Sequence, residues 1–222
     1  MVFLYFCSKK IILIVLLAGW VFGGYAQEVK FGVKAGMNMT SLGSDFKDLT
    51  DGFDQKTKIG FHIGAFVDLG ITENFYVQPG LYYSNKGMKL EADENSDYKI
   101  KVNLSYLEIP ILASYRFKLS DNMKLHINTG PYLAYGLGGK FKFEPSEFEE
   151  LMDGDVKAFD EDEGDLKRFD FGWSFGAGVN FSAVYVGLKY DLGFSNIAGD
   201  SYDEADMKIH NRNFSVSVGY TF

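Results

Sequence analysis

The stretch Asn213-Phe214-Ser215-Val216-Ser217-Val218-Gly219-Tyr220-Thr221-Phe222 determines the fold class of this chain. Aromatic or aliphatic residues occupy every second position, and Ser, Gly or Thr stands between them. This period of two is the signature of a β-strand with one apolar face. Such a strand fits either a soluble sandwich or a barrel whose outer face contacts lipid, so the rest of the chain has to decide between them.

Seven further segments alternate in the same way. The stretch 169–181 is the clearest, because Phe, Trp, Ala and Val alternate there with Asp, Gly, Ser and Asn. Together the segments predict an all-β chain of eight antiparallel strands, at 29–40, 58–69, 75–86, 100–117, 123–136, 169–181, 184–194 and 213–222.

Within the stretch 100–117 the apolar positions change phase. Apolar residues stand at even positions up to Tyr106 and at odd positions from Leu107 onwards. One extra residue in a strand produces such a change, which predicts a β-bulge near these two residues. Pro110 fits a bulged or poorly paired position, because proline has no N–H to donate to the ladder.

The volume inside an eight-stranded barrel decides which face points outward. That interior is just wide enough for side chains to fill. Several large apolar side chains from every strand do not fit there, whereas Gly, Ser and Asn do. A soluble, lipocalin-like barrel with its apolar face inside is therefore disfavoured. The 25 Gly and the 17% of aromatic residues suit a membrane barrel with small residues inside and aromatic residues outside.

The lengths of the connections support an up-and-down transmembrane barrel. Short connections (70–74, 119–122 and 182–183) alternate with long ones (41–57, 88–99, 137–168 and 195–211). Outer-membrane barrels have short periplasmic turns and longer extracellular loops. The long connections also contain most of the 30 acidic residues, which predicts long acidic extracellular loops.

The beginning of the chain has the pattern of a secretory signal peptide. Two lysines precede an apolar run at 11–22, and small residues lead up to Ala26. The run is shorter than the about 20 apolar residues that a spanning helix needs. We expect residues 1–26 to be removed, leaving 27–222 as the barrel domain. The one cysteine, Cys7, would leave with them, so a closed sheet in lipid rather than disulfides would supply stability.

The formal net charge of −8 argues against a nucleic-acid partner, which would require a basic face. The connection 137–168 is the most acidic, and the spacing of Ser146 and Glu149 predicts a short surface helix there that ends at Asp153. This connection lacks the spacing of a calcium-binding EF-hand loop. A solvated acidic surface that contacts an extracellular ligand is the preferred interpretation, with calcium binding as the alternative. Its candidate interaction residues are Glu147, Glu149, Glu150, Asp153, Asp155, Asp160, Glu161, Asp162 and Glu163.

Ionisable residues on the polar face would point into the barrel. Opposite charges in a filled lumen would pair, and we expect this structural role rather than catalysis or a cofactor site. The catalytic alternative needs a nucleophile beside a base, such as Ser174 or Ser215 with His62 or His126, and no local motif supports it. A narrow channel is a further alternative. The predicted lumen residues are Lys34, His62, Asp68, Glu108, Arg116, His126, Asp170, Lys189 and Asp191.

Three stretches resemble a known family. The segments 31–38, 80–87 and Tyr106-Leu107-Glu108-Ile109-Pro110-Ile111-Leu112 look like the PorT-type outer-membrane β-barrel family of Bacteroidetes. The resemblance covers essentially the whole chain after residue 26, and 106–112 together with 80–87 is its more specific part.

The resemblance implies an integral outer-membrane protein and offers no catalytic motif to transfer. Separately, the terminal stretch 213–222 resembles the closing strand of a bacterial outer-membrane β-barrel, and we expect the outer-membrane assembly machinery to read its end at Tyr220 and Phe222. We expect a structural or interaction role through the extracellular loops, with outer-membrane lipid around the barrel. The alternative is an accessory role in type IX protein secretion with secretion-system partners, and an outer-membrane enzyme or narrow channel ranks lower.

Overall fold

The computed structural model describes residues 28–44, 54–91, 99–144, 156–159, 166–199 and 208–222. The predicted signal peptide and the predicted helix near Ser146 lie outside these residues. Over the described residues the chain forms the strands β1 Glu28–Ser44, β2 Asp54–Lys56, β3 Lys58–Gly70, β4 Phe75–Glu91, β5 Lys99–Ser120, β6 Met123–Glu144, β7 Val156–Lys157, β8 Phe169–Phe181, β9 Val184–Gly193 and β10 Ile209–Thr221.

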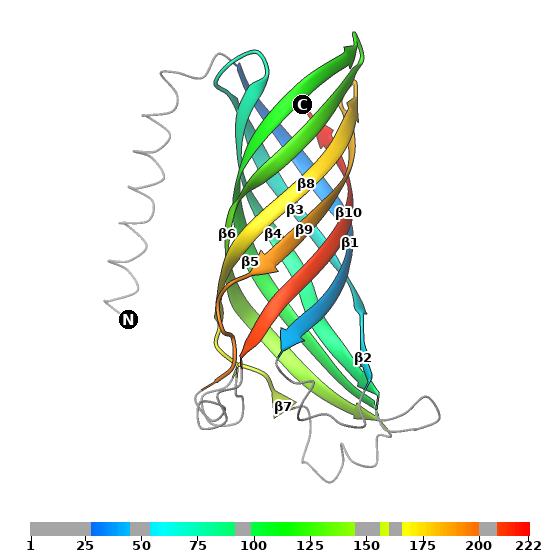
Figure 1. Ribbon diagram of the computed structural model, residues 1–222, viewed down its shortest axis with the longest axis vertical. Coiled ribbons are helices and arrows are strands. Elements are labelled where there is room, and N and C mark those ends of the chain that lie inside the picture. Colours follow the sequence, from blue (N-terminus) through cyan, green and yellow to red (C-terminus); the bar gives the residue numbers. More distant parts are fainter. Residues whose placement is uncertain (1–27, 45–53, 92–98, 145–155, 160–165, 200–207) are drawn as a thin grey trace, which may run out of the picture.

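Eight of these strands close into one antiparallel barrel (Figure 1). Each long strand pairs with its neighbour along the chain, and β1 pairs with β10 from Gly32 opposite Thr221 to Ser44 opposite Ile209. The short β2 and β7 add to the edges of β4 and β6. A closed ring satisfies the backbone groups of every strand, which the hydrocarbon core of a membrane requires. The predicted eight-stranded barrel is confirmed.

The apolar faces of the strands form the outside of the barrel. Large apolar side chains remain exposed on every barrel strand, including Phe31, Ile59, Phe175 and Val218, whose exposed fraction is 56%. A soluble protein rarely exposes a continuous apolar surface of this kind. The lipocalin-like alternative is therefore wrong. Among the described residues no helix is long and apolar enough to cross a membrane.

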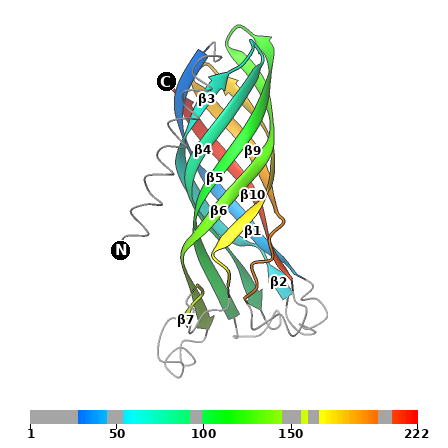
Figure 2. The same cartoon turned by 90° about the vertical axis from the view of Figure 1, so that its left-hand side faces the viewer.

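The two ends of the barrel differ. The connections 71–74, 121–122 and 182–183 lie at one end, together with the start of β1 and the end of β10 (Figures 1 and 2). We call this the short-turn end. The strand ends that flank the other four connections lie at the opposite end, the long-loop end. There β1, β4 and β6 continue beyond their expected last residues 40, 86 and 136, and β10 begins before its expected first residue 213.

The predicted bulge lies in a different strand from the one expected. The register between β5 and β6 shifts between Ser105 and Tyr106, but the extra residue is Leu137 of β6. The strand β5 keeps its alternation, and its even positions from Val102 to Arg116 all point inward. Pro110 pairs opposite Tyr132 with no shift of register.

The change of phase in β5 has another cause. Near the long-loop end the inner face of β5 is apolar, at Val102, Leu104 and Tyr106, and its outer face carries Asn103 and Ser105. From Leu107 onwards the outer face is apolar and the inner face is mostly polar. The strand β5 therefore has the polarity of a soluble protein near the long-loop end and of a membrane protein from Leu107 onwards.

Candidate functional site

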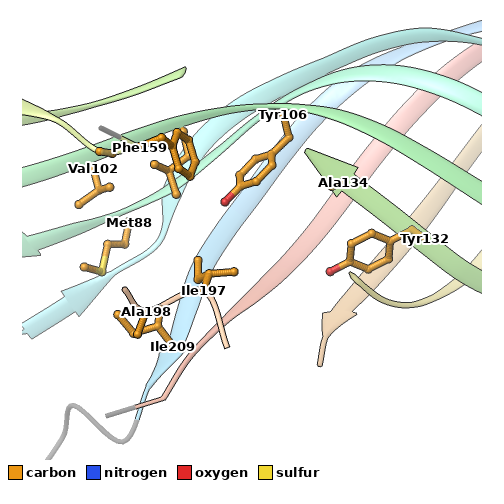
Figure 3. Packing of buried hydrophobic residues seen from close by; sticks show 11 residues of the cluster. Met88, Val102, Tyr106, Tyr132, Ala134, Phe159, Ile197, Ala198 and Ile209 are labelled. Atoms are coloured by element: carbon orange, nitrogen blue, oxygen red, sulfur yellow. The ribbon is translucent and has the colours of Figure 1, made fainter. Parts of the chain in front are cut away.

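An apolar cluster closes the lumen at the long-loop end. Its wall residues come from β4, β5, β6 and β10, and its centre comes from the connections that follow β6 and β9 (Figure 3). Ala158, Phe159, Ile197 and Ala198 from these connections are almost completely buried. We call this cluster the plug, and its members are Met88, Val102, Leu104, Tyr106, Tyr132, Ala134, Ala158, Phe159, Ile197, Ala198 and Ile209.

Hydrogen bonds in which at least one partner is a backbone group hold the plug against the barrel wall. The guanidinium of Arg168 donates from Nη2 to the carbonyl of Phe159 (2.6 Å) and from Nη1 to the carbonyl of Gly136 (3.1 Å). The amide of Ile197 donates to the carbonyl of Ile209 (2.9 Å). The side-chain oxygen of Asn196 accepts from the amides of Ala198 and Ile209. These contacts make the plug part of the fold.

A buried network of charges fills the lumen below the plug. Glu108 accepts from two lysines on opposite sides, with Lys86 Nζ at 2.7 Å from Oε2 and Lys189 Nζ at 2.8 Å from Oε1. Lys189 also contacts Asp191 (3.0 Å). The other oxygen of Asp191 accepts from the hydroxyl of Ser174 (2.6 Å). Lys86 was not among the predicted lumen residues, because it is the last residue of its expected strand. The alternation of that strand nevertheless places it inside the barrel.

Asp170 lies between this network and the plug. Its carboxylate accepts hydrogen bonds from Ser195 Oγ (2.7 Å), Asn211 Nδ2 (2.8 Å) and the hydroxyl of Tyr132 (3.3 Å). Three neutral donors thus satisfy a carboxylate with no exposed surface. Asn211 was not among the predicted lumen residues, since the strand expected there began at Asn213.

A second group of charges occupies the half of the lumen toward the short-turn end. Arg116 Nη2 lies 2.6 Å from Asp68 Oδ2, and the Gln78 amide donates to Asp68 Oδ1 (2.7 Å). The Lys34 ammonium lies 3.4 Å from Gln78 Oε1 and faces the ring of Tyr185, 4.5 Å from its centroid. The side chain of His126, also inside, lies near the same ring. Every predicted lumen residue thus lies within the barrel.

The ring of His62 lies between the hydroxyl of Ser217 and the amide of Asn38. This is the arrangement of a base between a nucleophile and an orienting group. Asn38 Nδ2 donates to oxygens of its neighbours, so its Oδ1 accepts from His62 Nδ1 (2.8 Å). In the neutral imidazole the other nitrogen, Nε2, then accepts from Ser217 Oγ (2.9 Å). The serines considered from the sequence bond elsewhere: Ser174 donates to Asp191 and Ser215 to the carbonyl of Lys189.

This arrangement has no room for a substrate. The internal cavity beside it has a volume of about 30 Å³, whereas one water needs roughly 10–15 Å³. Ser217 also lies in mid-strand, paired with Gly36 and Gly187, so its backbone is committed to the sheet. An oxyanion site requires free donors near the nucleophile. The geometry is that of a satisfied hydrogen-bond chain inside a filled barrel.

Among the residues that the structure describes, no group of three His, Cys, Asp or Glu side chains could hold a metal ion. The nine acidic residues proposed for the surface of the connection 137–168 lie outside the described residues. Tyr220 and Phe222 lie on the outer surface at the short-turn end, with their rings 5.2 Å apart.

The family described as outer membrane protein beta-barrel domain matches residues 25–199. No curated protein matches the chain.

Similar solved structures include three surface barrels. Ail, the attachment invasion locus protein of Yersinia pestis, is 14% identical over 88% of this chain and 100% of that chain, with a TM-score of 0.45. Neisserial surface protein A (NspA) is 12% identical over 88% of this chain and 100% of that chain, with a TM-score of 0.46. The outer membrane protein OprG from Pseudomonas aeruginosa is 10% identical over 87% of this chain and 95% of that chain, with a TM-score of 0.48.

Proposed function

The chain belongs to the family of outer membrane protein β-barrel domains, and on this premise we propose that it is a closed, non-catalytic barrel of the outer membrane that presents its long connections as an interaction surface. The filled lumen is the observation that carries this proposal. The plug and the buried charge network fill the part of the lumen that the structure describes, and the cavity beside the network has a volume of only about 30 Å³.

The long-loop end would face the outside of the cell. Outer-membrane barrels place short turns in the periplasm and long loops outside. The outer face of β5 becomes polar above Leu107, so the strand continues beyond the apolar band and raises the connections above the membrane surface. A rigid wall beneath them, closed by the plug, is a suitable base for an interaction surface.

The acidic connection 137–168 supplies the chemistry of this surface. Nine of its acidic residues, from Glu147 to Glu163, would attract a cationic partner such as a basic peptide or bridging divalent cations. Deleting the whole connection is a poor test, because Ala158 and Phe159 of the same segment form part of the plug. Replacing only the nine acids by their amides removes the charge and leaves the plug residues in place.

The test measures binding of fluorescent decalysine to the barrel in lipid nanodiscs. We expect saturable, salt-sensitive binding to the wild-type protein and at least ten-fold weaker binding to the variant with all nine acids replaced. The matched control replaces the exposed Asp121 and Glu73 at the short-turn end, and decalysine binding should not change. Equal binding by the nine-fold variant and the wild type would refute the proposed role of this connection.

The accessory role in type IX secretion remains the alternative proposal. It depends on the resemblance of the segment 106–112, and no contact among the described residues favours it. Loss of export of other proteins after deletion of the gene, restored by the nine-fold variant, would favour it over the loop-mediated role.

A further inference from the structure

The short-turn end contains an open cavity that the proposed function does not use. Its volume is about 280 Å³, and it lies at the mouth of the lumen between the turns 121–122 and 182–183 and the end of β10. Arg116, Lys124 and His126 line it from β5 and β6, and Asn180 lines it from β8. We call it the vestibule. It lies on the other side of the lumen from the plug.

Three side chains in the vestibule, those of His126, Arg116 and Asn180, have a buried polar atom with no hydrogen-bond partner, and in Asn180 this atom is the acceptor Oδ1. Only 3% of His126 is exposed, and its Nε2 makes no hydrogen bond. Only 6% of Arg116 is exposed, and its Nε is likewise without a partner. Burying a polar group without a hydrogen-bond partner is unfavourable. Such groups in the wall of an open cavity indicate a site for a polar ligand.

The rest of the Arg116 guanidinium is held firmly. Its Nη2 contacts Asp68 at 2.6 Å, and its central carbon lies 3.7 Å from the centroid of the Tyr76 ring. The salt bridge and the ring fix the plane of the guanidinium. Its Nε–H is thereby left as a pre-oriented donor, which is the property that makes arginine suited to oxyanions.

The charges around the vestibule favour an anion over a cation. Lys124 adds an ammonium to the wall, and Lys30 adds another that is paired with Glu28 (2.7 Å). The carboxylate in the lining, Asp121, is 94% exposed and pairs with Lys118 (2.8 Å). Of the charged side chains that line the vestibule, Lys30, Arg116 and Lys124 are cationic and Asp121 is anionic, although the chain as a whole carries a net charge of −8.

We propose that the vestibule binds the oxyanion group, a carboxylate or a phosphate, of a ligand that approaches from the periplasm. Arg116 Nε–H and His126 Nε2, in the tautomer that carries its proton there, are the inner donors, and the Lys124 ammonium is the outer one. The cavity is about twenty times larger than the roughly 10–15 Å³ that one water needs. It therefore accepts a small solute or the end of a larger one.

The test follows the ring nitrogens of His126 by NMR in phosphate-free maltoside micelles. Inorganic phosphate and citrate are the probes. We expect a saturable shift of the His126 signals and no comparable shift for the buried His62. Arg116→Lys keeps a charge beside Asp68 but lacks the Nε donor, and it should weaken binding at least ten-fold. Lys124→Gln leaves every buried contact intact and should weaken binding several-fold. Lys167→Gln removes an exposed lysine at the long-loop end, and this variant should bind as the wild type does.

The phosphate of a lipid headgroup is the other possible origin of the oxyanion that binds in the vestibule. If phosphatidylglycerol nanodiscs shift the His126 signals while free phosphate and citrate do not, the vestibule binds a headgroup, and the oxyanion site stands. If phosphate, citrate and phosphatidylglycerol all leave the signals unchanged, or if Arg116→Lys and Lys124→Gln bind as tightly as the wild type, the proposal is wrong. The decalysine experiment reports on the opposite end of the barrel, so the two proposals fail independently.

Discussion

Glu108 shows how a charge is kept inside this barrel. Its carboxylate lies between the ammonium groups of Lys86 and Lys189, and both the carboxylate and Lys86 are almost completely buried. Removing one member of such a group leaves the others with uncompensated charge, which typically costs about 3–5 kcal/mol. The arrangement is therefore stable only as a complete set.

We predict that Glu108→Gln lowers the free energy of unfolding by about 3 kcal/mol, because the buried Lys86 loses its counter-charge and Lys189 keeps only Asp191. The measurement is urea-induced unfolding of the protein from lipid vesicles, followed by tryptophan fluorescence. The control is Asp121→Asn, which breaks the exposed pair with Lys118 and should change stability by less than about 1 kcal/mol. Equal effects of the two substitutions would show that the lumen pairs are as solvated as the surface pair.

Ser217 provides a test of the non-catalytic role. We predict that the wild-type protein and Ser217→Ala hydrolyse neither p-nitrophenyl butyrate nor phospholipid, because no substrate reaches the His62 ring. Ser217→Ala should instead lower the free energy of unfolding by about 1 kcal/mol, since a buried hydrogen bond is lost. Hydrolysis by the wild type that disappears in Ser217→Ala would establish an enzyme.

Alternation along the strands was enough to place individual residues inside or outside. It could not show which inner residues pair, because the partners come from strands far apart in the sequence; Lys189 and Glu108 are 81 positions apart. The order of the strands brings them together, and no local pattern encodes a distance across the lumen. The same reason explains why Ser217, rather than Ser174 or Ser215, meets His62.

At the level of the strand, β5 shows the limit of reading periodicity alone. Its apolar residues change from the inner to the outer face between Tyr106 and Leu107, and the sequence pattern by itself cannot distinguish such a change of environment from a bulge. The structure has both, but the bulge lies in β6, at Leu137. The outer apolar stretch from Leu107 to Leu119 measures about 41 Å along the strand, or about 31 Å at a tilt of about 40°. This is long enough to span the apolar band of about 25 Å in outer-membrane barrels.

The two environments of β5 predict opposite sensitivities. Ile111→Arg, in the middle of the outer apolar stretch, should lower the free energy of unfolding by about 2–4 kcal/mol, because the charge enters lipid. Asn103→Arg, on the same outer face above that stretch, should change it by less than about 0.5 kcal/mol. Leu104→Ala, next to Asn103 but inside the plug, should cost about 2–5 kcal/mol.

The measurement is again urea-induced unfolding from vesicles. If Asn103→Arg were as costly as Ile111→Arg, the long-loop end of β5 would lie in lipid. If Leu104→Ala were neutral, the plug would not be a packed core.

On the scale of the whole molecule, the lumen is closed at two levels. The plug closes it at the long-loop end, and the network around Glu108 fills it below. Eight strands enclose so little space that side chains alone can fill it. Fold and outer-membrane location followed from patterns repeated in every strand, whereas the plug depends on four residues from two connections and has no periodic signal.

Because the plug and the charge network each close the lumen, loss of the plug alone should not open a channel. We predict that the double variant Phe159→Ser with Ile197→Ser, like the wild type, shows no conductance steps in planar lipid bilayers, because the paired side chains of Glu108, Lys86 and Lys189 still span the lumen. The same variant should unfold at lower urea concentration, since two buried apolar side chains are lost from the plug. A wild-type protein that conducts would overturn the closed-barrel proposal itself. Steps that appear only in the double variant would show instead that the plug alone keeps the barrel closed and that the charge network leaves a water-filled path.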